Sequence, residues 1–182
     1  MSIPLFERTF YFLRHGETES NRLLTIAGST DVELNDAGRA QALAAVELVR
    51  PLGVTHVISS AQRRARDTAT IIAGGLALPH TVVPGLAERN WGELEGKPRA
   101  LRVRGVTPPG AESAEQHISR TRAALAGINA RGTPLIVAHS GTFRVLCHLL
   151  ALNAPVDPIV NCRPARFLPP EGASASWMIE VF

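Results

Sequence analysis

Two stretches of sequence decide the fold, TFYFLRHG at residues 9–16 and PLIVAHSG at residues 134–141. Each begins with an apolar run that does not alternate with polar residues, which is typical of a strand buried on both faces of a sheet. Each run then passes into a histidine that is followed, directly or after one residue, by a glycine. The pattern predicts two buried strands, each ending in a histidine at the turn that follows it.

The rest of the chain alternates short β-branched runs with longer alanine-rich stretches of helical spacing, which predicts an α/β fold. We expect one domain over residues 1–182. Further strands are expected at residues 54–59, 81–83, 165–168 and 176–182, with the last two pairing as terminal strands.

Helices are expected in four places. They run from residue 36 to Pro51, over residues 64–72 with a stop at Gly74-Gly75, onward from Ser113 as N-cap, and from residue 139 through Leu152. Residues 97–110, rich in arginine, proline and glycine, are expected to form a loop.

The composition is that of an ordinary globular chain, with 182 residues of which 45% are apolar and 19% charged. Such a chain can build a core without disulfides or a structural metal. Cys147 and Cys162 form no CxxC or Cys/His cluster, so we expect a reducing, cytoplasmic setting. The apolar run at residues 10–13 is too short for a signal sequence or a membrane span, and no membrane partner is expected.

The basic residues are almost all arginine, since only Lys97 among the nineteen is a lysine. Arginine binds phosphate and carboxylate through two parallel hydrogen bonds, so the composition favours testing for an anionic partner. Coding bias alone also produces such a composition, and it is the better explanation for most of these residues. A net charge of +3 without interleaved aromatic residues gives little support to a nucleic-acid-binding module.

Chemically useful side chains follow several predicted strands. In open α/β sheets ligands bind beyond the carboxyl ends of the strands, so His15 and His139 are expected at one edge. Residues 60–64 follow the strand at 54–59 and add an arginine, and Glu88 follows the strand at 81–83. Such a set suits a phosphoryl group: arginines orient its oxygens, a neutral imidazole attacks phosphorus and a carboxylic acid protonates the leaving oxygen.

Other interpretations stay open at this point. A single histidine at a strand end is more often a hydrogen-bonded structural residue than a catalyst. Two histidines can also bind zinc, but no HxxEH motif or cysteine pair accompanies them, so no metal is expected. The remaining histidines receive no role: His56, His80, His117 and His148. Three arginines of the expected loop are more often solvated than ligand-binding, although the loop could also supply one of them to a second anionic group of a substrate: Arg99, Arg102 and Arg104.

The chain resembles the histidine phosphatase superfamily, in the branch that includes cofactor-dependent phosphoglycerate mutases. The resemblance begins with LRHGETESN at residues 13–21. It continues in family order through GSTDVELNDAGRAQA (28–42), SSAQRRARDTA (59–69), LAERNWGELEG (86–96), PPGAES (108–113) and VAHSGTFRVL (137–146). The resemblance implies a phosphoglycerate mutase-like, three-layer α/β/α sandwich around a mostly parallel sheet.

The resemblance also implies residue roles. His15 is expected to be the nucleophile that becomes phosphohistidine, and Arg14 and Arg64 to hold the phosphoryl oxygens. The R-A-x-x-T-A segment selects Arg64 over its neighbour. His139 is expected to contact the transferring phosphoryl group, and Glu88 to be the general acid and then the base.

Further contacts to the substrate are implied for Asn21, Thr18 and Ser140 or the backbone amide of Gly141. No metal or organic cofactor is implied, and the expected partner is a small phosphorylated metabolite. The sequence leaves a homodimer open. Ala61-Gln62 depart from the family pattern, where an aspartate or proline and a leucine are usual, and are expected to alter the packing under Arg64.

Length favours hydrolysis over mutase chemistry. Only eleven residues separate Gly96 from Pro108, where larger relatives carry an insertion that covers the site. The expected function is therefore a histidine acid phosphatase-type phosphomonoesterase for small molecules. Alternatives are a cofactor-dependent phosphoglycerate mutase and a protein-phosphohistidine phosphatase, although relatives of the latter kind generally lack an acid such as Glu88.

Overall fold

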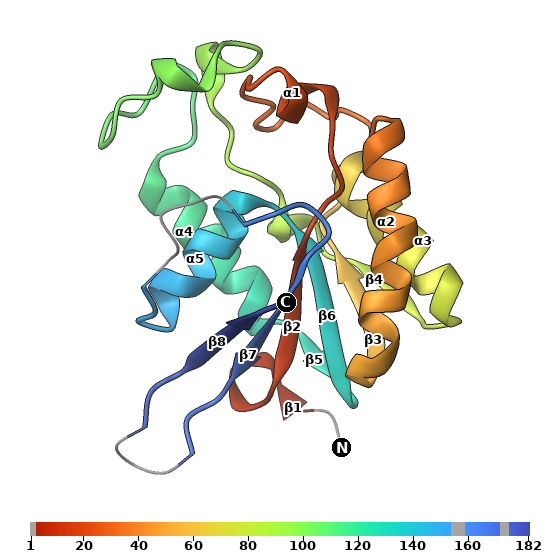
Figure 1. Ribbon diagram of the computed structural model, residues 1–182. Coiled ribbons are helices and arrows are strands. Elements are labelled where there is room, and N and C mark those ends of the chain that lie inside the picture. Colours follow the sequence, from red (N-terminus) through yellow and green to blue (C-terminus); the bar gives the residue numbers. More distant parts are fainter. Residues whose placement is uncertain (1–2, 154–158, 172–174) are drawn as a thin grey trace.

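The framework of the molecule is a six-stranded mixed sheet in the order β4-β3-β6-β2-β7-β8 (Figure 1). The computed structural model describes residues 3–153, 159–171 and 175–182. The strands are β2 (Phe10–Arg14), β3 (Val54–Ser59), β4 (His80–Val82), β6 (Thr133–Ala138), β7 (Pro164–Leu168) and β8 (Met178–Val181). The first four strands in this order run parallel, and β7 and β8 extend the sheet in antiparallel fashion. The predicted mostly parallel sheet and the pairing of the two C-terminal strands are confirmed.

Helices cover both faces of the sheet, which confirms the three-layer arrangement (Figure 1). On one face lie α2 (Asp36–Val49) and α3 (Arg63–Leu76), and on the other α4 (Ala114–Ala126) and α5 (Ser140–Leu149). The α4 helix begins at the predicted N-cap, because the Ser113 hydroxyl accepts the backbone N–H of Gln116 and the Gln116 side chain binds back in a capping box.

The central strand β2 divides the core into two halves. Phe10 and Phe12 point into the cluster under α4 and α5, whereas Tyr11 and Leu13 point into the cluster under α2 and α3. Successive side chains of a strand point to opposite faces, so a strand covered on both sides must be apolar at every position. This explains why the run at residues 10–13 shows no polar alternation.

Two predicted helix ends are wrong. The α3 helix continues through Gly74-Gly75 to Leu76 and ends at Ala77, which has a left-handed φ of 52°. A Cβ at Gly75 would lie 2.8 Å from Val46 Cγ1, so this glycine serves the close packing of α3 on α2. The α5 helix ends at Leu149, before the predicted Leu152, whose backbone N–H turns back to the carbonyl oxygen of Cys147.

Several short elements escape the sequence patterns. A second, two-stranded sheet pairs β1 (Ile3–Pro4) with β5 (Asn129–Ala130), and α1 (Glu19–Arg22) is a single helical turn. The expected loop at residues 97–110 contains a 3-10 turn at Arg99–Leu101. No helix in the described ranges is both long enough and apolar enough to cross a membrane.

The register of the sheet brings distant residues to one edge. Arg14 of β2 pairs with Ala138 of β6, so the next residues along the chain, His15 and His139, leave the sheet side by side. The backbone N–H of His15 donates to the carbonyl oxygen of Ala138 at 3.0 Å. The β3 strand ends at the same level, because Ser59 pairs with Val137 of β6.

Candidate active site

The two strand-end histidines form the centre of a buried polar cluster. Their ring centroids are 5.2 Å apart, with an angle of 57° between the ring planes. His15 is 5% exposed and His139 fully buried, although both belong to polar residue types that normally reach water. A pair of buried imidazoles at the carboxyl edge of a parallel sheet is the arrangement that the sequence predicted.

The His15 ring is held in one tautomer. Its Nδ1 lies 2.7 Å from the carbonyl oxygen of Gly16, and a carbonyl oxygen can only accept, so Nδ1 carries the proton. Burial, followed by the charges of Arg64 and Arg14, holds the pKa of His15 well below its usual range. The ring is therefore neutral at neutral pH and keeps a lone pair on Nε2, as a nucleophile requires.

His139 differs from His15, because its nitrogens have no hydrogen-bond partner among the described residues. Within the described residues neither Nδ1 nor Nε2 makes a hydrogen bond, although both are buried. Leaving such groups unpaired costs about 1–3 kcal/mol, and native proteins rarely retain them without a functional reason. Burial, then the charges of Arg64 and His15, also lowers the pKa of His139 well below its usual range.

Two arginines lie beside the histidines. Arg64 is 1% exposed and is fixed by backbone carbonyls: Nη2 donates to Gly28 at 2.8 Å and Nη1 to Thr30 at 2.9 Å. Arg14 donates from Nη1 to the carbonyl oxygen of Ile159 at 3.0 Å, whereas its buried Nε has no partner among the described residues. Burial, with a smaller contribution from the charge of Arg99, lowers the pKa of Arg14 to about 10, so the guanidinium stays charged at neutral pH.

Glu88 reaches the same space from the segment after β4. Its Oε2 accepts the backbone N–H of Gly141 at 2.9 Å, and its Oε1 accepts that of Arg89 at 2.8 Å. A Cβ at Gly141 would lie 1.9 Å from Glu88 Oε1, so only glycine allows this approach. The position of Glu88 thus depends on the turn that follows His139, which links the carboxylate to the histidine pair.

The three further residues expected to contact the substrate, Asn21, Thr18 and Ser140, differ in their surroundings. Asn21 and Ser140 line the cavity described below. Thr18 is buried and caps α1, because its hydroxyl accepts the backbone N–H of Asn21 while the Asn21 side chain accepts that of Thr18. The capping box fixes the turn from which Asn21 points toward the site, and direct contact of Thr18 with a substrate stays a prediction.

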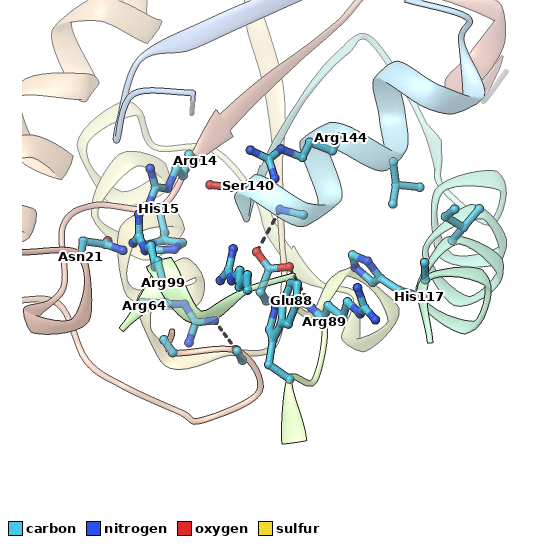
Figure 2. Close-up of a pocket in the computed structure, with 18 of the residues that line it drawn as sticks. Arg14, His15, Asn21, Arg64, Glu88, Arg89, Arg99, His117, Ser140 and Arg144 are labelled. Carbon is cyan, nitrogen blue, oxygen red and sulfur yellow. Dashed lines mark hydrogen bonds between the residues drawn. The ribbon is translucent and has the colours of Figure 1, made fainter. Parts of the chain in front are cut away.

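A cavity of about 410 Å³ opens from this cluster. Figure 2 shows Glu88 lying between His15 and His117. Further lining residues are outside the predicted set: Arg89, Trp91, Arg99, Arg102, His117, Arg144 and His148. The guanidinium carbons of Arg89 and Arg102 lie 4.5 Å and 4.2 Å from the centroid of the Trp91 ring, which fits cation–π contact.

Some of these residues could have been found from the sequence. Arg144 lies one helical turn after Ser140, so it shares a helix face with a predicted site residue. Arg99 and Arg102 line the cavity, contrary to the solvated-loop interpretation, whereas Arg104 is exposed and does not line it. His117 gave no such signal, because its direction depends on how α4 packs.

The segment at Asn161 and Cys162, which the sequence did not indicate, holds the backbone of Arg14 and His15. Asn161 donates from Nδ2 to the carbonyl oxygen of His15 at 2.6 Å, and the backbone N–H of Cys162 donates to the carbonyl oxygen of Arg14. In the part of the chain that is described, no three or more His, Cys, Asp and Glu side chains gather as a metal site would need. The guanidinium and imidazole groups that are present are donors of the kind that bind an oxyanion.

Fold and site together define an α/β protein with a pocket rich in arginine and histidine at the carboxyl edge of its sheet. The model of the histidine phosphatase superfamily (branch 1) matches residues 10–163. The chain belongs to this superfamily.

Named relatives differ in what they are described to do. A probable phosphoglycerate mutase, GpmB, from Yersinia pestis (strain Pestoides F) is 33% identical, with 93% of this chain and 90% of that protein aligned. An agropine synthesis reductase from Rhizobium rhizogenes is 31% identical over 94% of this chain, which spans only 41% of the reductase. Among solved structures, a mycobacterial glucosyl-3-phosphoglycerate phosphatase complexed with VO3 has a TM-score of 0.79 at 28% identity, covering 96% of this chain and 98% of that one.

Proposed function

We propose that this protein hydrolyses small phosphomonoesters through a phosphohistidine intermediate on His15. The observation that carries the proposal is the difference in hydrogen bonding between His15 and its neighbours His139 and Arg14. His15 has one nitrogen committed to Gly16 and the other left as a lone pair, while the nitrogens of His139 and Nε of Arg14 are unpartnered within the described residues. A phosphoryl group bound there would meet a nucleophile and supply acceptors to the unpaired donors.

The proposed reaction has two steps. In the first, Nε2 of His15 attacks phosphorus, the bond from phosphorus to the ester oxygen breaks, and protonated Glu88 gives its proton to the departing alcohol. In the second, water attacks phosphorus, the bond to His15 breaks, and the Glu88 carboxylate takes a proton from that water. Arg14, Arg64 and His139 stabilise the charge on the equatorial oxygens in both steps.

The charge of the cavity favours a substrate with a second anionic group. Among the described residues, the charged side chains that line it are one carboxylate, that of Glu88, and six arginines: Arg14, Arg64, Arg89, Arg99, Arg102 and Arg144. A phosphoryl dianion neutralises only part of this excess, so a carboxylate or second phosphate on the substrate would be attracted to the side where Arg102 stacks on Trp91. The similarity to a phosphatase that acts on glucosyl-3-phosphoglycerate is compatible with such a substrate.

The test is phosphate release from a panel of phosphorylated metabolites that carry one or two anionic groups. We expect turnover that His15→Ala abolishes, with a labelled phosphohistidine trapped by rapid acid-free quenching of the wild type. If His15→Ala keeps the wild-type rate, the proposed function is wrong.

The panel also separates the two alternatives. A phosphoglycerate mutase rate comparable to the rate of phosphate release would favour the mutase that the similarity to GpmB suggests. Glu88→Gln should lower hydrolysis of an alkyl phosphate by about 10²–10⁴-fold, since an alkoxide needs a proton to leave. No loss in Glu88→Gln would favour a protein-phosphohistidine phosphatase, whose leaving imidazole needs little protonation.

A further inference from the structure

Gln62 is the residue at which the chain departs from the leucine usual at this point of the family segment. It is the N-cap residue of α3, two positions before Arg64, and is 8% exposed. A buried amide must satisfy its polar atoms, and this one does so within the site. Its Nε2 donates to the carbonyl oxygen of Gly28 at 3.0 Å.

The carbonyl oxygen of the Gln62 side chain receives two donors from different parts of the site. One is Nη2 of Arg64 at 3.2 Å, and the other is the backbone N–H of Glu88 at 2.7 Å. Because Nη2 of Arg64 also donates to Gly28, the amide and the guanidinium share one backbone acceptor and close a ring of hydrogen bonds. A leucine side chain could accept neither donor.

This amide makes the direct polar connection between the phosphoryl-binding arginine and the acid-bearing segment. The neighbouring backbone is held from another side, since Nη1 of Arg120 donates to the carbonyl oxygens of Gly85 and Ala87. The Glu88 carboxylate is anchored by Gly141. The N–H of Glu88 itself is paired with Gln62.

We propose that Gln62 is a positioning residue that fixes the distance between Glu88 and Arg64, so that the acid meets the leaving oxygen of a phosphoryl group held by that arginine. The inference rests on the phosphomonoesterase function proposed above. It assigns Gln62 no contact with the reacting atoms. Its effect is expected in the step that needs Glu88, because a displacement of about 1 Å can cost 10²-fold in rate.

The decisive variant is Gln62→Met, which keeps the length of the side chain and removes both the acceptor and the donor. We expect kcat/KM for glycerol 3-phosphate, whose leaving alkoxide needs a proton, to fall by about 10–100-fold. For 4-nitrophenyl phosphate, whose leaving phenolate needs little protonation, kcat/KM should fall less. The fold-change for this ester should be below about one third of the fold-change for glycerol 3-phosphate. The pH profile for the alkyl ester should also change on the limb that reports the general acid.

Gln41→Met is the matched control. The Gln41 side chain also accepts a backbone N–H, that of Glu17 at 2.9 Å, but it does not connect Arg64 with Glu88. It should leave the ratio between the two esters at the wild-type value, whatever its effect on stability. Gln62→Glu is the rescue variant, since a carboxylate can still accept from both Arg64 and Glu88. Its second oxygen cannot donate to Gly28 as Nε2 does, so it should restore the ratio between the esters only in part. It should also raise KM, because a negative charge beside Arg64 opposes phosphate binding.

Three results would overturn the inference. Equal losses on both esters in Gln62→Met, or no loss on either, show that the amide does not position the acid. An ester ratio in Gln62→Glu as low as in Gln62→Met shows that the two accepted hydrogen bonds are not the cause. A wild-type protein that releases phosphate from neither ester defeats the proposed function and this inference together, whereas the first two results with an active wild type defeat this inference alone.

Discussion

The two ends of the cavity are built in different ways. The inner end comprises the lining residues Arg14, His15 and Arg64 together with His139, whose ring packs beside that of His15. These residues lie at strand ends and at the start of α3, and all four side chains are buried. The rim, formed by Arg89, Trp91, Arg99, Arg102 and Arg144, is half-buried or exposed, and most of it lies on irregular chain.

The difference teaches how chemistry and selection are divided in this protein. Strand register fixes the relative positions of the residues at the inner end. This suits a reaction that needs its nucleophile and its positive charges in fixed places. Loops can change length and sequence without disturbing that register, so the rim is suited to choosing the substrate. Changes at the inner end should therefore act on kcat, and changes at the rim on KM.

Among the variants that compare the two ends, His139→Ala at the inner end is expected to have the largest effect. Loss of a preorganised donor to the phosphoryl oxygens should lower kcat by about 10²–10³-fold. His148→Ala is the matched control, because His148 lies in the last turn of α5, the helix that His139 caps, and is an exposed residue of the cavity lining. It should change kcat by less than about threefold. Comparable losses in steady-state phosphate release would show that the two ends do not differ.

A second effect concerns the support of the inner end. A Cβ at Gly38, in the first turn of α2, would lie 2.0 Å from the carbonyl oxygen of Glu17, just after the His15 turn. Gly38→Ala should lower the free energy of unfolding by about 1–3 kcal/mol, although alanine normally favours helices. Gly74→Ala in α3, where no atom lies within 4 Å of the new Cβ, should raise it by about 0.4–1 kcal/mol. Denaturant midpoints measure both, and a stable Gly38→Ala would contradict the close packing under the site.

The third effect is a pH dependence of stability that originates at the inner end. The pKa of His15 and that of His139 are held well below the usual range, chiefly by burial. Below about pH 6.5 the unfolded chain takes up protons that the folded chain excludes, so stability present at higher pH is lost as the pH falls.

The expected loss is up to ~1.4 kcal/mol per pH unit for each of the two histidines. Urea unfolding of the wild type and of His139→Ala, at about pH 7 and about pH 5.5, isolates the second histidine. The variant should lose less stability on acidification, and identical losses would show that His139 titrates normally in the folded protein.

The smallest effect is expected at the rim. Arg102→Ala should raise KM about tenfold for a substrate with a second anionic group and leave kcat nearly unchanged. The reason is that a single hydrogen-bonded ion contact at a half-buried arginine contributes about 1–2 kcal/mol to binding. Arg104→Ala is the control on the same loop, because Arg104 is exposed and does not line the cavity. A fall in kcat without a change in KM would place Arg102 with the inner end.

The same division decides what the sequence could predict. Apolar strands followed by histidine place His15 and His139 at one edge, since parallel strands in register bring their ends together whatever the loops do. Glu88 is expected at this edge because it follows the predicted strand at 81–83, and the resemblance selects Arg64; the structure brings both to that edge. Their catalytic roles stay predictions.

The sequence could not show features that depend on how separate elements meet. Gly75 is predicted to end a helix, because the low helix propensity of glycine can be read from the sequence. The close approach of the Val46 side chain, which requires a glycine there, cannot be read from it. His117 lines the cavity only because of how α4 packs, and Asn161 binds His15 from a segment without a motif. Tertiary contacts overrode local preference in the first case and created the site in the others.

The stack at the rim has a practical consequence. The chain holds two tryptophans, and they lie in different settings. Trp91 contacts Arg89 and Arg102 at the cavity, whereas Trp177 is half-buried and packs against the core under α4 and α5, with its ring centroid 5.8 Å from that of Phe10. An anion that draws Arg89 or Arg102 from the Trp91 ring changes the electrostatic environment of that indole and hence its emission. In a Trp177→Phe variant Trp91 is the sole tryptophan, so a change in the tryptophan emission of that protein reports the binding of an anion in the cavity.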